Sequence, residues 1–532
     1  MPRSLPWILF TLLVCSSSLE GQAGSTNDVQ VLDHTMVPRG RLRLQAHPVF
    51  TSWDSRFGRA ADGTSRVESL GDDLTDPTAL SLFPGLSTLT RSVEDLTAIP
   101  FDPALGASAA SVQQDVTRID FGGHVGVFDW LTVGVVVPWA RTRSAIDVAF
   151  APDSTNANLG LNPAFTSSAQ VDAFLGSIDA ADAAAQAYAA AECSSGPSAA
   201  CTSAQALAGR TTLFDAALRA AYGASPFFPL SGTAIGDALA QSITDLSSDL
   251  SAAGLTVLDP LVLSSDLLLE ESDLSLLPAI AGSGIEMAPL ETRQSLWSAG
   301  DVELSARVRV LDNLTPRDSA WTHPGVGYRL TVSGLVRLPT GTVADPDVPY
   351  DLGTGQAQTD MQAGVTATLA FGERLSLTAG GVYGVQGEST IVRRVAPHEV
   401  VLAPVASRAQ VVWRPGSYVG LGIAPSIHLA PSITLSGEYR LVHKRRDEFA
   451  LVSAVPGLDP VVLALESGVK AHQVGGGLRY STVERWRRGD ASVPLEAHIR
   501  LLATIDGSGG QVPKATRVEA GIRLFRRLWG AP

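Results

Sequence analysis

The sequence predicts an all-β transmembrane barrel of about twelve antiparallel strands that carries a large α-helical insert. Three observations lead to this fold class: apolar and polar residues alternate in many segments, these segments are long, and the connections between them alternate between short and long. In residues 302–310, every second residue from Val302 to Val310 is apolar, while Glu303 and Arg307 take the opposite parity. A barrel strand needs this alternation, because one of its faces contacts lipid and the other faces a polar interior.

The N-terminus predicts export from the cytoplasm of a Gram-negative cell. Residues 1–23 hold an apolar run from Leu5 to Val14 and end in small and polar residues, which is typical of a secretory signal peptide cleaved after Ala23. Cys15 could accept a lipid, but Val14 before it is bulkier than the residue that lipoprotein signals carry there. We therefore expect an exported chain without a lipid anchor, located in the outer membrane.

The barrel is expected in two parts of the chain, residues 24–150 with three strands and a long first loop, and residues 298–532 with nine. Most predicted strands have 13 to 18 residues, more than the ~9–11 that cross a bilayer at a tilt. Short links alternate with long ones, as in outer-membrane barrels with short periplasmic turns and long extracellular loops. The predicted strands are 41–58, 112–127, 130–149, 298–313, 325–340, 357–371, 373–388, 404–428, 433–447, 470–484, 492–506 and 514–529.

Tryptophans near strand ends predict an aromatic girdle at the level of the lipid headgroups. Trp413 is the exception, because it falls inside the predicted strand 404–428, just before a likely bend at residues 414–416. If 404–413 and 417–428 were separate strands, the barrel would need a further partner, which residues 59–111 could supply. The girdle candidates are Trp53, Trp130, Trp139, Trp297, Trp321, Trp486 and Trp529.

Residues 151–297 form an acidic insert in which the apolar period changes from 2 to 3.6. They hold 16 Asp and Glu against 3 Arg, which is a net charge of −13. Strand parity makes the insert extracellular, where it could close over the barrel mouth or fold partly into it. Its apolar helical stripes are Val171, Phe174, Leu175, Ile178 and Tyr188; Leu213, Phe214, Ala217, Leu218 and Tyr222; Ile235, Leu239, Ile243, Leu246 and Leu250; and, as a fourth candidate, Leu267, Leu274 and Leu277.

Cys193 and Cys201 are the two cysteines left after signal cleavage, and they stand close together between the first two predicted helices. An exported chain matures under oxidising conditions, so the spacing favours a disulfide that closes a small loop. A free thiol pair or a metal site is the weaker interpretation, because no histidine lies nearby in the sequence.

Four short motifs resemble one family of outer-membrane barrels. They are LVRLPTGTVADPDVPYDLGTG at 335–355, GDVEL at 300–304, VFDWLTVGVVVPW at 127–139 and PRGRLRL at 38–44. The chain resembles the family assigned to transport in the meta-cleavage (MetA) pathway of phenol degradation, over residues 40–150 and 298–529. The resemblance implies a barrel near twelve strands and a transport role.

The glycines of the 335–355 motif allow two interpretations. Gly341, Gly353 and Gly355, with Pro339, could shape a sharp turn that needs positive φ, or they could contact a ligand directly. The turn is the interpretation that we favour from the sequence.

No enzyme signature stands out, so neither a catalytic site nor a cofactor is expected. His398 and Glu399 begin a zinc-protease pattern, but Leu402 occupies the position of its second ligand. A nucleophile elbow, a phosphate-binding loop and a CxxC pair are missing from the sequence. No metal site is expected either; weak candidates are Asp266, Glu270, Glu271 and Asp273, whose carboxylates stand close together in the insert.

Charged residues of inward parity are the candidate site. They could line a channel or neutralise one another in a salt-bridge ladder that fills the barrel, and the sequence does not decide between the two. Both signs of charge occur, so strong ion selectivity is not predicted. The candidates are Glu303, Arg307, Arg309, Arg329, Arg337, Glu438, Arg440, Glu496, Arg500 and Arg523.

These observations predict a porin-like channel for passive passage of small solutes, including hydrophobic or aromatic ones. The alternative is a surface-exposed binding or structural protein whose barrel serves as a membrane anchor. Expected partners are outer-membrane lipid, a small-molecule solute and the barrel-assembly machinery during biogenesis. Nucleic acid is not expected, because the chain carries a net charge of −14 and has no basic patch.

Overall fold

The computed structural model describes residues 32, 35–59, 64–76, 82–83, 86–151, 157–265, 275–280, 283–314, 325–372 and 374–529. The predicted signal peptide at 1–23 and the girdle candidate Trp321 lie outside these residues. In the described part of the chain, no helix is both long enough and apolar enough to cross a membrane.

Within the described residues, twelve strands form one closed antiparallel barrel, because β10 pairs with β5 after the sheet has passed through all the others. Every barrel strand thus has two neighbours, and no backbone edge faces lipid. The short β8 (Arg293–Gln294) and β9 (Ser298–Ala299) add to the edge of β5. The barrel strands are β1 (Arg41–Trp53), β4 (Ala107–Phe128), β5 (Leu131–Ala151), β10 (Glu303–Asp312), β11 (Val326–Arg337), β12 (Asp360–Phe371), β13 (Leu375–Gln386), β16 (Tyr418–Ala430), β17 (Ile433–Lys444), β19 (Val469–Ser481), β20 (Leu495–Ser508) and β22 (Thr516–Arg527).

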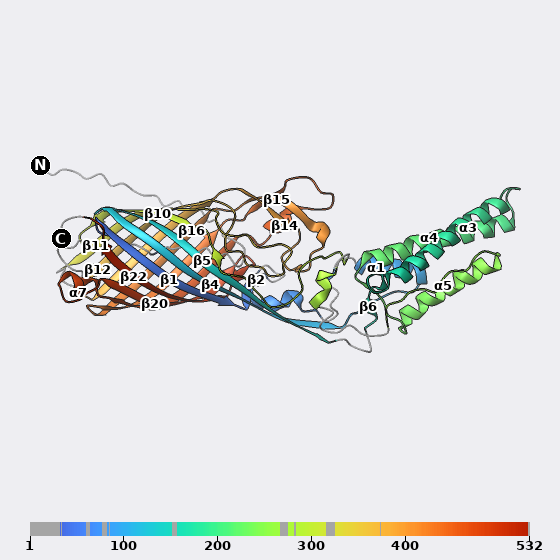
Figure 1. Cartoon of the computed structure of the whole chain (residues 1–532), viewed down its shortest axis with the longest axis horizontal. Helices are drawn as coiled ribbons and strands as arrows, with labels where there is room; N and C mark the ends of the chain where they lie inside the picture. Colours follow the sequence, from blue (N-terminus) through green and yellow to red (C-terminus); the bar gives the residue numbers. More distant parts are fainter. Residues whose placement is uncertain are drawn as a thin grey trace.

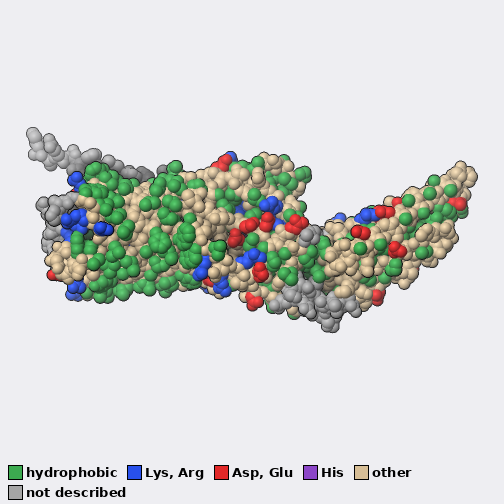
Figure 2. All heavy atoms as spheres, in the orientation of Figure 1, with side chains coloured by type: hydrophobic (Ala, Val, Ile, Leu, Met, Phe, Trp, Pro, Cys, Tyr) green, Lys and Arg blue, Asp and Glu red, His purple; other side chains and the backbone are tan. Residues whose placement is uncertain are grey.

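The barrel is apolar outside and polar inside. On β12, Val365 is 46% exposed while the next residue, Thr366, is 6% exposed. The same alternation places Leu304 outside and Glu303 inside on β10. Figure 2 shows apolar side chains over the barrel wall, with charged side chains gathered toward its two ends. A wall of this kind is suited to lipid, as in transmembrane barrels.

The two ends of the barrel differ. β1 begins and β22 ends at one end, which we call the terminal end, together with the tight turns that follow β4, β12 and β16. The opposite end, which we call the mouth, carries long connections and two small sheets (Figure 1). These sheets consist of β14 (Ser389–Arg394), β15 (Arg408–Arg414) and β18 (Glu448–Leu451), and of β2 (Ser55–Arg59), β3 (Ser65–Ser69) and β21 (Val512–Pro513).

The predicted strand 404–428 is wrong as a single strand. Its first part becomes the short 3-10 helix η3 (Val405–Ser407) and β15, and only β16 enters the barrel. No extra barrel strand is needed, because β15 pairs with β14 and β18 instead. Trp413 is therefore 2% exposed in the mouth sheet, where its indole N–H donates to Asp447 at 3.0 Å. Alternation alone could not separate these sheets, since both have period 2.

The acidic insert forms a helical arm that projects away from the barrel (Figure 1). β4 and β5 stay paired up to Ala107 and Ala151, so the hairpin extends toward the arm. The insert therefore neither closes over the barrel mouth nor folds into it, which were the two placements considered from the sequence. The elements of this region are η1 (Leu70–Leu74), α1 (Leu86–Thr97), β6 (Leu159–Leu161), α2 (Pro163–Thr166), α3 (Ser168–Glu192), α4 (Ala199–Ala224), β7 (Phe227–Pro229), α5 (Ala234–Ala252) and η2 (Leu277–Ala279).

The helical arm has an apolar core and a charged surface, as water-soluble domains do. Phe174 of α3, Leu218 of α4 and Leu246 of α5 are at most 1% exposed and belong to one cluster. Two assignments from the sequence are corrected here. Leu213 is 51% exposed and lies off the α4 stripe, and Trp53 is 5% exposed within this cluster instead of in a girdle. The β1 end meets protein at the mouth, not lipid, which explains the burial of Trp53.

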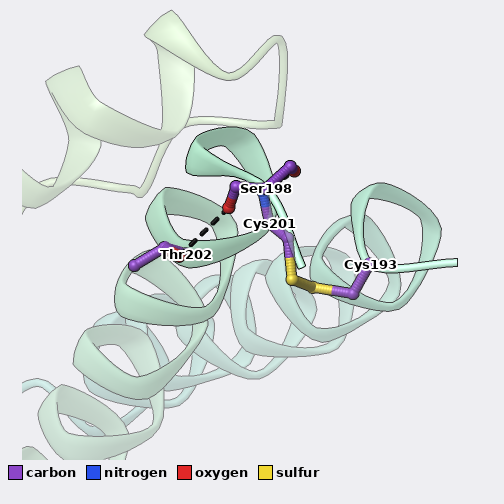
Figure 3. The surroundings of a disulfide bond; sticks show 4 residues. All are labelled: Cys193, Ser198, Cys201 and Thr202. Atoms are coloured by element: carbon purple, nitrogen blue, oxygen red, sulfur yellow. Dashed lines mark hydrogen bonds between the residues drawn. A yellow bond between two sulfur atoms is a disulfide. The ribbon is translucent and has the colours of Figure 1, made fainter. Parts of the chain in front are cut away.

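Cys193 and Cys201 form the expected disulfide, with their Cα atoms 4.7 Å apart. It joins the end of α3 to the first turn of α4 (Figure 3). Ser198 caps α4 by accepting a hydrogen bond from the backbone N–H of Cys201 at 3.0 Å. Thr202 donates to the Ser198 carbonyl at 3.0 Å, so the loop is held by both covalent and hydrogen bonds.

Candidate functional site

A polar cavity of about 850 Å³ occupies the terminal end of the barrel. Residues that precede β1 enter it: Val37 is fully buried, its backbone N–H donates to Thr132 at 3.0 Å, and Arg523 donates to Thr35 at 3.2 Å. The short helix α7 (Val483–Arg487) also lines the cavity. The barrel interior is thus open toward the terminal end but narrowed there by the chain itself.

A continuous network of charged side chains, which we call the ion-pair belt, crosses the barrel interior. Its first part runs from Asp360 through Arg337, 2.9 Å away, to Glu303 at 3.0 Å and then to Arg118 at 3.6 Å. Arg118 pairs with Asp120. These five side chains come from β12, β11, β10 and β4, and all are at most 4% exposed.

The second part of the belt passes through a histidine. The His47 ring lies 3.8 Å from Asp120 and 3.6 Å from Glu519. Arg500 lies between two further carboxylates, 2.7 Å from Glu519 and 3.6 Å from Glu438. Glu438 also pairs with Arg440. Arg517 also pairs with Glu519, at 2.8 Å, so five arginines face five carboxylates and the charges in the belt nearly cancel. Buried charges are found in pairs of this kind because an unpaired one is costly.

Of the ten predicted interior residues, seven line the 850 Å³ cavity, and Glu438, Arg440 and Arg500 among these seven also belong to the belt. Arg309 and Arg329, both paired with Asp312, line the 850 Å³ cavity together with Glu438, Arg440, Glu496, Arg500 and Arg523. Glu303 and Arg337 lie in the belt, and Arg307 is 8% exposed. Residues of the predicted set thus line a cavity and also form ion pairs across the interior.

The remaining interior wall is built from small side chains. β16 turns Gly420, Gly422 and Ala424 inward, and β19 does so with Gly475 and Gly477. A Cβ added at Gly422 would lie 3.0 Å from the side chain of Leu32, so the chain before β1 packs against this wall.

At the mouth, the connection between β11 and β12 folds over the barrel and is held by Asp301. The Asp301 carboxylate accepts hydrogen bonds from the backbone N–H groups of Gly341 at 2.9 Å and Gln356 at 3.1 Å. Thr340 donates to the carbonyl of Gly300 at 2.8 Å. Farther along, Tyr350 donates to the Leu70 carbonyl at 2.8 Å, which fixes the connection to η1.

The glycines of this connection serve close packing. Gly341, Gly353 and Gly355 do not have positive φ, so the turn interpretation is wrong in its mechanism. A Cβ on Gly341 would lie 2.7 Å from the backbone of Gly355, and one on Gly355 would lie 2.4 Å from Asp301. Two chain segments touch here backbone to backbone, which only glycine permits.

A second pocket, which we call the mouth pocket, has a volume of about 300 Å³ and lies among the long loops. Leu352 of the β11–β12 connection, Val401, Trp413 and Leu463 contribute apolar walls. Its floor includes Gln356, which accepts a hydrogen bond from Gln386 at 2.9 Å. Gln386 also donates to Asp360 at 3.1 Å, so the mouth pocket adjoins the ion-pair belt.

Two basic residues line the mouth pocket without an ion pair. Burial lowers the pKa of Arg393 to about 10. The surrounding protein, and next the Arg56 guanidinium, lower the pKa of His398 to about 4, so this ring is neutral at pH 7 although it is accessible from the pocket. Arg394 differs, because it donates to Asp347 at 2.8 Å and to several carbonyl oxygens.

Metal-binding clusters of three or more His, Cys, Asp or Glu residues do not occur among the described residues. The weak candidates Asp266, Glu270, Glu271 and Asp273 lie outside them.

Several interior residues escaped prediction from the sequence. Arg118, Asp120, His47 and Glu519 belong to the belt, and all of them have inward parity in strands that were predicted. Parity could therefore have identified them. No local signal marks Arg393, because β14 lies in the segment 389–403, which the sequence assigned to a connection between strands.

Comparisons with known proteins find solved structures of low sequence identity and low TM-score. No family model and no curated protein matches the chain. Among solved structures, the "COG4313 outer membrane channel" from Pseudomonas putida F1 is 8% identical with a TM-score of 0.41, over 94% of this chain and 100% of that one. The toluene transporter TbuX from Ralstonia pickettii is 10% identical with a TM-score of 0.26, over 92% of this chain and 90% of that one. The toluene transporter TodX from Pseudomonas putida is 9% identical with a TM-score of 0.25, over 96% of both chains.

Proposed function

We propose that the chain is an outer-membrane channel for passive passage of small solutes, including hydrophobic or aromatic ones. The observation that carries the proposal is the arrangement of two cavities around one polar network. The ion-pair belt contributes Glu438, Arg440 and Arg500 to the 850 Å³ cavity, and it reaches the 300 Å³ mouth pocket through Asp360 and Gln356. A solute that enters at the mouth therefore meets an apolar pocket first and a charged interior next.

The orientation follows from the two ends of the barrel. Short turns lie at the terminal end, which is typical of the periplasmic side. The mouth, with its long connections and the helical arm, then faces the outside of the cell. Under this proposal the ten interior residues predicted from the sequence line or narrow the route, the protein is not an enzyme, and its barrel is inserted by the barrel-assembly machinery.

The barrel family of the meta-cleavage (MetA) pathway remains part of the proposal. Two of the four motifs that carry the resemblance meet at the mouth, where Asp301 of the GDVEL segment holds Gly341 of LPTG and the residue after LGTG. A shared structural role for these motifs supports the relationship.

The second candidate function is a surface-exposed protein whose barrel anchors the helical arm. One observation favours it: the belt places buried charged pairs across the interior, and the arm projects well beyond the mouth. The two functions differ in whether small solutes cross the barrel.

Osmotic swelling of proteoliposomes that contain the full mature chain tests the difference. For a channel, we expect small neutral solutes to enter faster than into protein-free vesicles, with rates that fall as the solutes become larger. Deletion of residues 151–297 should leave this flux in place. Vesicles that stay as tight as protein-free ones, with and without the arm, would identify the barrel as an anchor.

A further inference from the structure

We propose that the mouth pocket is a binding site for small apolar carboxylates, with the Arg393 guanidinium as the group that recognises the carboxylate. This inference rests on the proposed channel function and deepens it by naming a class of solute that the channel selects. Three observations carry it: the row of the sheet on which Arg393 stands, its hydrogen bonds, and the state of the other charged groups around the pocket.

Arg393 stands in an apolar row of the mouth sheet. On β14 it has the same parity as Ile391, which is 7% exposed in a hydrophobic cluster with Val411 and Trp413. Its partner across the ladder is Ala409, whose side chain also packs against this cluster. An arginine at a position that the pattern reserves for an apolar residue is unusual, because burying a guanidinium is costly unless it is paired.

The guanidinium of Arg393 has N–H donors that are not used in hydrogen bonds within the described residues. Its Nη1 donates to the carbonyl oxygen of Ala344 at 3.3 Å, and its buried Nη2 has no hydrogen-bond partner among the described residues. No carboxylate of the described chain lies within 4 Å of it, in contrast to Arg394 beside it, which pairs with Asp347 at 2.8 Å. A bound carboxylate would satisfy this buried cation and accept from two of its N–H groups at once.

The acidic residues around the pocket have hydrogen-bond or ion-pair partners of their own. Asp447 pairs with Lys444 at 2.8 Å and also accepts from the Trp413 indole. Asp351 accepts from the backbone N–H of Asp345 at 2.7 Å, and Asp345 accepts from that of Asp347 at 2.9 Å. Asp351 also attracts the Arg393 guanidinium electrostatically, but no carboxylate of the described residues forms an ion pair with it. Arg393 is therefore a cation of the pocket that an incoming carboxylate can pair with.

The walls of the pocket determine the size and polarity of the rest of the ligand. Its volume of about 300 Å³ is at the small end of the roughly 300–1,000 Å³ that small-molecule sites occupy. Val401, Trp413, Phe449 and Leu463 line it, so the body of the ligand is apolar and compact. A carboxylate on a single ring fits both the cation and the apolar walls.

Binding of benzoate to the purified full-length protein in detergent, measured by isothermal titration calorimetry, tests the inference. We expect saturable binding of benzoate, with much weaker binding of benzamide, which has the same shape and no charge. Acetate, which has the charge without the ring, should also bind weakly. Equal binding of benzoate and benzamide, or no saturable binding of benzoate, would overturn the proposal.

Two variants that each remove one arginine give the matched comparison. Arg393→Gln should weaken benzoate binding about tenfold or more, because it removes charge-assisted hydrogen bonds. Arg408→Gln is the control: Arg408 lies on the neighbouring strand, its side chain is half exposed and pairs with Asp347, and it does not line the pocket. Equal affinity of Arg393→Gln and the unaltered protein, or an equal loss in both variants, would contradict the assignment.

Arg393→Lys keeps the experiment informative if Arg393→Gln does not fold. The lysine retains the charge but loses the two parallel N–H donors of the guanidinium. We therefore expect a benzoate affinity between that of the unaltered protein and that of Arg393→Gln. An unchanged affinity would count against Arg393 as the recognising group. Failure of this inference is distinguishable from failure of the channel. Loss of benzoate selectivity with intact flux of neutral solutes overturns only the pocket assignment, and benzoate binding without any flux overturns only the channel.

Discussion

In the barrel, Val365 is 46% exposed and its neighbour Thr366 is 6% exposed, whereas in the helical arm Phe174 is 1% exposed and Arg219 lies at the surface. The barrel keeps its charges inside, in the ion-pair belt, and its apolar side chains outside. The arm does the opposite. One chain uses both arrangements because lipid surrounds the barrel wall and water surrounds the arm. The solvent next to each region therefore decides which side chains it buries.

The largest expected effect comes from breaking the belt. Arg337→Met removes the cation that lies between Glu303 at 3.0 Å and Asp360 at 2.9 Å, which leaves buried Asp360 without an ion pair and buried Glu303 with Arg118 alone, at 3.6 Å. We expect the free energy of unfolding in lipid vesicles, measured by denaturant titration, to fall by about 3–5 kcal/mol.

A compensated variant serves as the control for the belt. Arg337→Met combined with Glu303→Gln and Asp360→Asn removes the unpaired charges as well, and part of the lost stability should return. If Arg337→Met alone unfolds at the same denaturant concentration as the unaltered protein, the belt does not stabilise the barrel.

Two substitutions to arginine compare the outer surfaces of the two regions. Val365→Arg places a charge near the middle of β12, and in lipid we expect it to cost roughly 2–4 kcal/mol of unfolding free energy. Leu213→Arg changes an apolar residue that is 51% exposed on the arm, where water surrounds the new charge, and its effect should stay within about 0.5 kcal/mol. Equal costs at the two positions would show that they face the same solvent.

The disulfide contributes to the arm alone. Cys193→Ser opens the small loop between α3 and α4, and we expect a loss of roughly 2–3 kcal/mol in the stability of the arm, with no change in unfolding of the barrel. Limited proteolysis followed by mass spectrometry separates the two, since cleavage should increase only between α3 and α5. Faster cleavage within the barrel strands would mean that the arm and the barrel unfold together.

The smallest effect is expected from the charged surface of the arm. Arg219 of α4 pairs with Asp215 at 2.8 Å and with Asp179 of α3, but its side chain is 44% exposed. Arg219→Gln should change the stability of the arm by no more than about 1 kcal/mol, whereas Phe174→Ala should cost about 3–5 kcal/mol. Thermal unfolding of the arm, followed by circular dichroism at the helical signal, compares the two variants. A larger loss from Arg219→Gln than from Phe174→Ala would contradict an apolar origin of its stability.

The barrel strands could be predicted from the sequence because their signal is local. Alternation over a long segment sets both the strand and its two faces, so Glu303 and Leu304 were assigned to opposite sides before any contact was known. Alternation fails where a strand leaves the barrel. β15 has the same period as β16, and only its pairing with β14 and β18 shows that it belongs to another sheet.

The mouth could not be predicted, because its contacts join residues that are far apart in the chain. Asp301 holds Gly341 and Gln356, and the burial of Arg393 depends on loops contributed by several connections. Glycine-rich motifs marked the place but suggested the wrong mechanism, since close backbone contact and positive φ use the same residue type.

Fluorescence quenching at single cysteines tests most directly whether lipid surrounds the barrel wall and water surrounds the arm. The native pair, Cys193 and Cys201, is bonded, so Val365→Cys and Leu213→Cys can each be labelled with one environment-sensitive fluorophore in proteoliposomes. We expect the label at position 365 to be quenched by a lipid-attached nitroxide and protected from aqueous iodide, and the label at position 213 to show the reverse. Iodide quenching at 365 without quenching by the lipid would contradict the account.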